Sequence, residues 1–351
     1  SNVRFGVNAG NSIASGGNNN TVVGDEAGTS VTTGVQNTLI GSEAGDALTV
    51  GVRNVAVGFD SLSSDTQGSK SIAIGRSALA TQNFTSATDA YNVAVGDYAG
   101  AFVTTGTNNT LIGGLAGSAL TTGANNTFVG VSAGGVGVVT GNSNNCVGVG
   151  ALQSLTSGAN NSTLGDSAGT SVNTGSNNLL LGHDAGRTGS PGGNVTAGSN
   201  VIVLGDENIT SAQIKVDWTV VSDARDKTDF TALDLGLDFV NALAPVTYKW
   251  DMRSKYGDKS AEGYDLAAQT PDGTHKEDWL DIGFKAQDVE ALEIAAGYKI
   301  ADKTNLTTSL TSDGKQMGLQ YSKFVPILVK AIQEQQALIV ELEARLSALE
   351  V

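Results

Sequence analysis

One short pattern of apolar, small and polar positions repeats through the first 205 residues of the chain. A glycine follows an apolar residue twelve times, most often at intervals of 17 residues, and Ala or Ser usually stands three positions after that glycine. The twelve glycines are Gly6, Gly24, Gly41, Gly58, Gly75, Gly96, Gly113, Gly130, Gly148, Gly165, Gly182 and Gly205. A fixed period of this kind is typical of stacked units that bury their apolar sides against one another. The pattern therefore predicts a parallel β-solenoid, of the β-roll kind, over residues 1–205.

Two apolar columns within each repeat are predicted to form the core of the solenoid. The residue before the glycine is Val, Ile or Leu in most copies, as at Val23 and Ile40. We expect it to face inward together with the Ala or Ser three positions after the glycine. A second column, about seven positions after the glycine, includes Val31 and Leu48 and precedes a turn such as Thr-Thr-Gly. Each repeat should supply two short strands and two turns, and twelve repeats at about 4.8 Å should extend roughly 55 Å.

Asparagine recurs four positions before the repeat glycine. It stands at Asn20, Asn37, Asn54, Asn92, Asn109, Asn126, Asn144, Asn161 and Asn178. Stacked rungs would place these amides above one another, and asparagine ladders are a known stacking device. The alternative is a repetitive ligand surface, for example for ice or a glycan. The repeat also loosens at residues 76–91 and 187–200. The insertions there, which include Phe84 and Tyr91, either expose aromatic contacts for recognition or are padding between rungs.

The repeat stops after Gly205, and the pattern becomes mixed α/β. Residues 233–243 have helical spacing, and residues 246–250 have the pattern of a strand. The C-terminal residues, which we assign to a helix within 322–351, carry apolar side chains at heptad spacing. The heptad positions are Val325, Ile332, Ile339 and Leu346, with Leu328, Gln335, Leu342 and Leu349 three residues later. This stripe predicts a coiled coil with one polar layer at Gln335.

Composition narrows the function classes. The net charge of −15 argues against nucleic-acid binding, which depends on clustered Lys and Arg, and the chain has no apolar run near 18 residues that would span a membrane. Cys146 is the single cysteine, and only His183 and His275 could join it, so we expect a structural thiol, no metal and no cofactor. The shaft also lacks the repeat motif of calcium-binding rolls. Because the chain begins within a repeat, we expect attachment sequences upstream.

Four separated motifs after residue 221 resemble the intramolecular chaperone domain of phage tail fibres and tail spikes, a self-cleaving Ser-Lys family. Residues 222–227 (SDARDK) resemble its Ser-Asp-x-Arg-x-Lys opening, and residues 245–250 (PVTYKW) resemble its Pro-x-x-Tyr-x-Trp strand. Residues 283–289 (GFKAQDV) are similar to its Gly-x-x-Ala-Gln-Glu-Val segment, and Tyr321 precedes the terminal helix. Asp226 and Asp288 depart from the family pattern. The repeats also resemble the heads of trimeric adhesins, a less specific similarity.

The resemblance implies a homotrimer whose C-terminal domain, residues 222–351, sets the register of the chains through a trimeric coiled coil. Residues 206–221 would form a junction, and the peptide bond between Val221 and Ser222 would then be cut. Ser222 is the implied nucleophile and Lys227 the general base, with Asp223 and Arg225 in support. Lys227 must be neutral to accept a proton, which burial or a neighbouring cation such as Arg225 would favour.

The expected function is that of a virion tail fibre or spike component that contacts a host receptor, such as a glycan, and joins upstream tail proteins. A bacterial trimeric surface adhesin is one alternative, although it should end in a membrane β-barrel. A structural fibre with an uncleaved trimerisation cap is another. In either alternative Ser222 acts as a helix N-cap and Lys227 as a surface charge. A polysaccharide depolymerase would need paired carboxylates in a groove, but the shaft has few aromatic residues and scattered acids.

Overall fold

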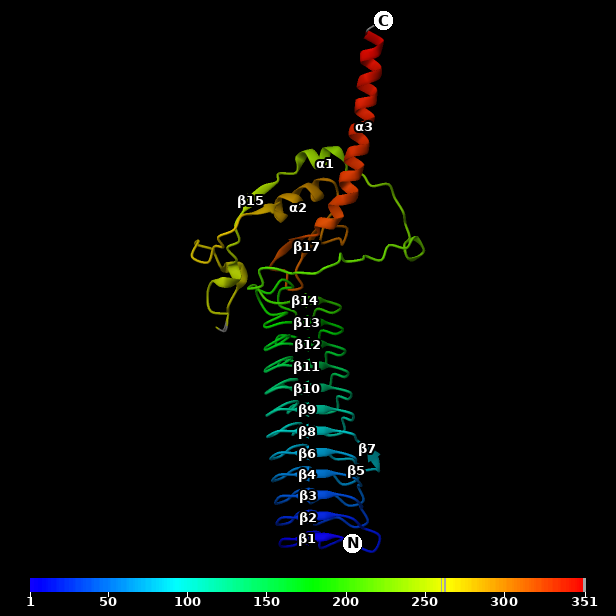
Figure 1. Ribbon diagram of the computed structural model, residues 1–351, viewed down its shortest axis with the longest axis vertical. Coiled ribbons are helices and arrows are strands. Elements are labelled where there is room, and N and C mark those ends of the chain that lie inside the picture. Colours follow the sequence, from blue (N-terminus) through cyan, green and yellow to red (C-terminus); the bar gives the residue numbers. More distant parts are fainter. Residues whose placement is uncertain (260, 262, 350–351) are drawn as a thin grey trace. The chain divides into compact units, whose positions relative to one another are not determined.

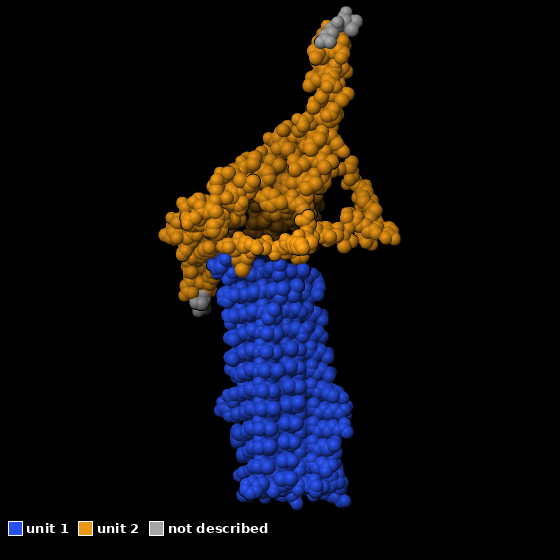
Figure 2. Space-filling view, in the orientation of Figure 1, with its two compact units in different colours: residues 1–208 blue, residues 209–351 orange. Residues whose placement is uncertain are grey.

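The computed structural model describes residues 1–259, 261 and 263–349 (Figure 1). The chain divides into two compact units, Ser1–Asn208 and Ile209–Val351, which are coloured separately in Figure 2. The first unit is a parallel β-solenoid and the second contains the helices, including the long C-terminal one. The predicted fold class, mainly β with a solenoid followed by a C-terminal helix, is confirmed.

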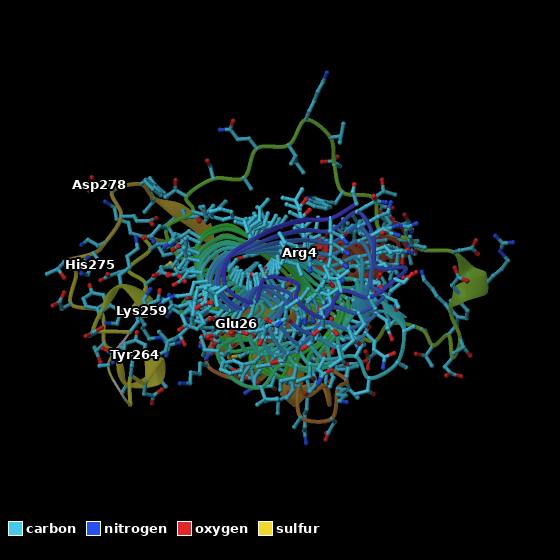
Figure 3. All side chains as sticks on the ribbon, turned by 90° about the horizontal axis from the view of Figure 1, so that it is seen from below. Arg4, Glu26, Lys259, Tyr264, His275 and Asp278 are labelled. Atoms are coloured by element: carbon cyan, nitrogen blue, oxygen red, sulfur yellow. The ribbon has the colours of Figure 1, made fainter. Side chains whose placement is uncertain are left out.

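The solenoid is built around one parallel sheet of twelve three-residue strands, here called the solenoid sheet, in which each strand pairs in register with the next rung. Its strands are β1 (Val3–Phe5), β2 (Thr21–Val23), β3 (Thr38–Ile40), β4 (Val55–Val57), β6 (Ile72–Ile74), β8 (Val93–Val95), β9 (Thr110–Ile112), β10 (Thr127–Val129), β11 (Asn145–Val147), β12 (Ser162–Leu164), β13 (Leu179–Leu181) and β14 (Ile202–Leu204). Seen along the stack in Figure 3, the rungs overlie one another, with Arg4 in the first.

The predicted inward columns are correct in two places and wrong in one. The Ala or Ser three positions after the glycine is buried, as at Ala27 and Ser61, and so is the column that contains Val31 and Leu48. The residue directly before the glycine, however, points outward: Ile40 is 37% exposed, whereas its neighbour Leu39 is fully buried. Side chains of a strand alternate between faces, so only the middle residue of each three-residue strand enters the core.

The expected second strand of each repeat is also absent from most described rungs. Outside the solenoid sheet, the first unit contains only the short parallel pair β5 (Gly68–Ser69) and β7 (Thr88–Asp89), and an isolated bridge between Leu120 and Val139, among the residues that the structure describes. Several hydrogen bonds between turns hold the other side of the rungs together, for example from Ser30 N to Asp46 O at 2.8 Å and from Thr32 N to Thr49 O at 2.9 Å. Turns rather than a second ladder therefore close the rungs.

The asparagine ladder is buried and continuous over most of the solenoid. Asn109 is typical: its Oδ1 accepts the backbone N–H of Asn126 at 3.0 Å, and its Nδ2 donates to the carbonyl of Gly123 at 3.0 Å. The amides thus bind the next rung and a turn at once, which favours the structural interpretation over a ligand surface for these residues. Cys146 occupies the middle of β11 and is buried, and burial raises the pKa of its thiol.

The insertion at residues 76–91 does not expose both of its aromatic side chains. Phe84 is buried, whereas Tyr91 is half exposed and its hydroxyl lies 2.9 Å from Lys70 Nζ. The prediction that this loop presents Phe84 to a ligand is therefore wrong. Its backbone is drawn inward because Phe84 N donates to the buried carboxylate of Asp65 at 3.1 Å.

The second unit contains short strands and helices between longer loops. Its elements are η1 (Ala224–Asp226), α1 (Leu237–Ala242), β15 (Val246–Tyr248), η2 (Arg253–Lys255), η3 (Leu266–Ala268), β16 (Asp281–Gly283), α2 (Ala286–Ala295), β17 (Thr308–Leu310), β18 (Met317–Leu319), η4 (Tyr321–Lys323) and α3 (Phe324–Leu349). Strands β15 and β16 pair antiparallel, as do β17 and β18. The core joins α1, α2 and the start of α3 through Leu235, Phe239, Val289, Phe324 and Ile327.

Candidate functional site

The predicted nucleophile and base lie side by side at the start of the matched motifs. Lys227 Nζ is 2.6 Å from Ser222 Oγ and 3.4 Å from the Ser222 carbonyl oxygen. The single turn of η1 produces this approach because it folds the backbone between the two residues back on itself, with Lys227 N donating to Ala224 O at 3.3 Å. Both side chains are exposed. The spacing of five residues in the sequence is thus compatible with a direct Ser-Lys hydrogen bond.

Asp223 and Arg225, the predicted supporting residues, pair with each other. Asp223 caps η1, since its Oδ1 accepts the N–H of Arg225 at 2.9 Å, and its Oδ2 lies 2.6 Å from Arg225 Nη2. The Arg225 guanidinium lowers the pKa of the Asp223 carboxyl. The ion pair offsets the positive charge of Arg225, and the Asp223 cap stabilises the turn.

The hexapeptide of residues 222–227 is held only by its own contacts. Every hydrogen bond that the structure describes for these six residues stays within the hexapeptide. An exposed Ser-Lys pair has the right atoms for nucleophilic attack, but water competes for both groups. Reactive chemistry at this pair would therefore need a further surface to cover it.

The other three motifs converge on one another in the second unit. Strand β15 pairs with β16 so that Tyr248 stands opposite Asp281, with Tyr248 Oη donating to Asp281 Oδ2 at 3.2 Å. Burial, with the neighbouring Asp281 carboxylate, raises the pKa of Tyr248 to about 12. Tyr321 Oη accepts the N–H of Phe284 at 3.2 Å, and a Cβ on Gly283 would lie 2.3 Å from that oxygen. A side chain larger than glycine at residue 283 would therefore require the Tyr321 hydroxyl to shift.

The sequence analysis missed a buried carboxylate in the same unit. Glu293 in α2 is buried and accepts hydrogen bonds from Thr307, through both its backbone N–H and its hydroxyl, and from the hydroxyl of Thr308. Burial alone raises the pKa of Glu293, but these hydrogen bonds outweigh it and hold the pKa below its ordinary value. A lone glutamate in a helical pattern gives no signal of this role in the sequence.

The predicted heptad positions of α3 form an exposed apolar stripe. Helix α3 buries Phe324, Ile327 and Ala331 against the second unit, and the remaining face carries the heptad residues. We call that face the heptad stripe: Val325, Leu328, Ile332, Gln335, Ile339, Leu342, Leu346 and Leu349, all of them exposed. The range assigned to the coiled coil, 322–351, ends on residues 350 and 351, which lie outside the described residues.

A second exposed apolar stripe runs along the solenoid sheet, on the face that the sequence analysis assigned to the core. We call it the outer stripe. It consists of the last residue of each strand: Phe5, Val23, Ile40, Val57, Ile74, Val95, Ile112, Val129, Val147, Leu164, Leu181 and Leu204, all exposed or half buried. An exposed apolar surface of this extent is uncommon on monomeric proteins and is typical of contact surfaces. The sequence could have indicated this arrangement, because the residue that precedes each of these positions is small or variable, and it is this middle residue of the strand that faces the core.

The described residues provide neither a cluster of metal ligands nor a membrane-spanning helix. No group of three or more His, Cys, Asp or Glu side chains is placed there to hold a metal ion. None of the helices formed by these residues combines the length and the hydropathy needed to cross a bilayer.

Comparison with known proteins gives one family match, which lies in the second unit. A search of curated proteins returns no significant match to this chain. A family model described as the chaperone of endosialidase matches residues 222–298, so the matched segment begins at Ser222 and includes η1, β15, β16 and α2. Over these residues the match confirms the resemblance to the chaperone family that the motifs predicted.

Proposed function

We propose that the chain is a tail fibre or tail spike component of a phage, whose C-terminal segment drives trimerisation and then cleaves itself off between Val221 and Ser222. The observation that carries this proposal is the 2.6 Å approach of Lys227 Nζ to Ser222 Oγ at the first residue of the family match. In functional terms we assign residues 1–205 to the shaft, 206–221 to a junction and 222–351 to the chaperone.

The heptad stripe supports self-association through α3. Its aliphatic side chains are exposed in the single chain, with Ile332 at 64%, and each would contribute about 1.5–3 kcal/mol when fully buried. A seven-residue repeat over the whole helix fits a left-handed coiled coil of identical helices, in which Gln335 forms one polar layer. Polar layers of this kind favour a single alignment of the chains.

The outer stripe supports the same assembly in the shaft. Identical rungs pair almost equally well when shifted by one repeat, so a long sheet of near-identical strands has a weakly specified register. A coiled coil at one end fixes the alignment before the outer stripes come together, and this is the role that we assign to the chaperone segment.

In the proposed cleavage, the Ser-Lys pair first converts the peptide bond into an ester, and water then hydrolyses that ester. The neutral amine of Lys227 takes the hydroxyl proton as Ser222 Oγ attacks the carbonyl carbon of Val221. The C–N bond then breaks, its nitrogen takes a proton and becomes the free amine of Ser222, and an ester joins Val221 to Ser222 Oγ. Water hydrolyses the ester, which leaves a carboxylate on Val221 and restores the hydroxyl.

Burial by neighbouring chains would couple this chemistry to assembly. The pair is exposed in the single chain, and removing it from water favours the neutral amine that the reaction needs. Cleavage would then occur after the trimer forms. The shaft, which we place in the virion with upstream fibre proteins, would contact a host receptor such as a glycan.

The intact mass of the expressed chain tests the proposal, beside a Ser222→Ala variant as control. We expect fragments of residues 1–221 and 222–351 from the parent and none from the variant, with both sedimenting as trimers. An uncut parent that still forms trimers would overturn the self-cleavage and leave a structural cap. An uncut monomer would overturn the assembly role as well.

A further inference from the structure

An open groove lies on the surface of the last three rungs of the solenoid, those of strands β12, β13 and β14 (Figure 1). Its volume is about 390 Å³, which is within the range of sites for small ligands. Amides from the turns before the strands line the groove, together with the first residue of each strand. These residues are Asn160, Asn177 and Asn200, and Ser162, Leu179 and Ile202.

The three amides keep most of their hydrogen-bonding capacity. Each stands five positions before a repeat glycine and is exposed. Asn177 Nδ2 donates to Asn200 Oδ1 at 2.7 Å, and this is the one side-chain hydrogen bond of the three amides in the described part of the chain. Because an amide offers two N–H donors and an oxygen with two lone pairs, the row presents both donors and acceptors to a ligand.

The turn conformation does not by itself account for three consecutive asparagines. Their φ values are 58°, 56° and 63°, in the left-handed region that asparagine tolerates well. The equivalent positions of earlier rungs adopt the same conformation but carry Arg53, Lys70 and Tyr91. The backbone therefore accepts charged and aromatic side chains at this position, and the groove is the place where a row of uncharged amides occupies it beside aliphatic residues.

The side chains that line the groove select an uncharged ligand rich in hydroxyl groups. None of the described residues that line it is charged, although the chain has a net charge of −15. Leu179 and Ile202 present aliphatic surface beside the amides, and Ile202 is 69% exposed. A pyranose ring matches both features, because its hydroxyls can bond to amides while its C–H groups pack against aliphatic side chains.

We propose that this groove binds a neutral saccharide. The inference rests on the proposed function and deepens it, because it gives the glycan contact a place on the shaft. The amides of Asn160, Asn177 and Asn200, about 4.8 Å apart from rung to rung, hold the hydroxyls, and Leu179 and Ile202 carry the apolar side of the ring. A single chain supplies the whole site, since every lining residue belongs to one solenoid.

Binding of the full chain to an array of neutral glucose-, galactose- and mannose-based oligosaccharides tests the groove, with sulfated oligosaccharides as the acidic comparison. We expect binding to neutral members of the array. Glycine is the suitable replacement for the asparagines, because it keeps the positive φ and removes only the amide. Asn160→Gly or Asn177→Gly should weaken binding by about tenfold or more, the equivalent of one hydrogen bond.

Asn125→Gly is the matched control. Asn125 has φ 60° and stands five positions before Gly130, in a rung that lies outside the groove. Its replacement removes the same group from the same kind of turn and should leave binding within about threefold of the parent. Circular dichroism of all three variants checks that the solenoid is intact.

Three outcomes would overturn the groove: no binding to any neutral oligosaccharide, binding only to the sulfated probes, or an equal loss in Asn125→Gly. Intact mass and sedimentation of the same samples report cleavage and assembly separately. A cleaved trimer that binds no saccharide therefore overturns the groove and leaves self-cleavage and trimerisation standing. An uncut monomer overturns those two roles whatever its binding to the array.

Discussion

Asn92 donates its side-chain amide to Gln82 Oε1 at 2.8 Å, at the one place between Asn20 and Asn178 where the asparagine ladder is interrupted by a serine, Ser71. Gln82 Nε2 in turn lies 3.0 Å from Ser71 Oγ and 2.5 Å from Asp65 Oδ2. A glutamine from the other side of the rung thus replaces the missing amide and joins the two halves of the ladder.

Replacing Gln82 should therefore destabilise the solenoid. Gln82→Leu removes one partner of Asn92 and one partner of Asp65, and a buried polar group that loses a hydrogen bond costs about 1–3 kcal/mol. Adding Ser71→Asn should recover part of the loss, because the ladder becomes continuous. Thermal unfolding of both single variants and the double variant measures the coupling, and simple additivity would contradict it.

The adjacent glycines Gly113 and Gly114, which follow strand β9, offer a second test. Gly113 has φ +129°, and a Cβ there would lie 2.6 Å from the carbonyl oxygen of Gly130 in the next rung. Gly113→Ala should cost about 3 kcal/mol or more, since it combines backbone strain with a clash between rungs. Gly114→Ala is the control, because its Cβ would meet no atom within 4 Å. Chemical denaturation that gave similar losses for both would contradict the close stacking at Gly113.

The buried carboxylate of Glu293 predicts a pH dependence of the second unit. Its folded pKa lies below the ordinary value of 4.5, so the carboxylate stabilises the fold above pH 4.5, and this contribution is lost as the pH falls through the folded pKa. Unfolding followed in the second unit should show this acid loss, and Glu293→Gln should flatten it while lowering stability at neutral pH. An unchanged pH profile in the variant would argue against the assignment.

The polar layer at Gln335 should lower the stability of the coiled coil while favouring one alignment of its helices. Gln335→Leu should stabilise the assembled helices by about 1 kcal/mol per chain, because an aliphatic side chain replaces an amide in the interface. Gln333→Leu, on the opposite side of α3, is the matched control and should have little effect. Sedimentation and thermal melting would measure both, and a larger gain at residue 333 would place the interface elsewhere.

Lys227 should be needed for cleavage and dispensable for assembly. Replacing a general base typically costs 10²–10⁴-fold in rate, so Lys227→Met and Lys227→Arg should both leave the chain uncut over the time in which the parent is processed. Lys215→Met, which removes a lysine on the other side of the bond, should be cut normally. Time-resolved intact mass would report the rates, and processing of Lys227→Met at the parental rate would exclude Lys227 as the base.

The sequence pattern was sufficient for the solenoid, the asparagine ladder and the terminal helix, because each depends on a period that repeats many times. It misplaced the outer stripe, since Val23 or Ile40 before the glycine resembles a core residue when the chain is considered alone. In the proposed trimer, the apolar character of those positions would reflect burial between chains rather than within one. Local contacts without a period, such as Gln82 to Asn92 or Glu293 to Thr307, leave no pattern in the sequence.

The Ser-Lys pair was predictable from its motif, and its geometry follows from a single turn of η1. What surrounds the pair in the assembly was not predictable, because the chain carries no local residue that covers it.

Most rungs present to the next the same glycine carbonyl and the same asparagine amide that they receive from the rung before. Gain or loss of one 17-residue unit by unequal recombination would therefore lengthen or shorten the shaft by about 4.8 Å without disturbing either end. The length of the shaft could thus evolve in steps of one rung, independently of the C-terminal segment to which we assign the alignment of the chains.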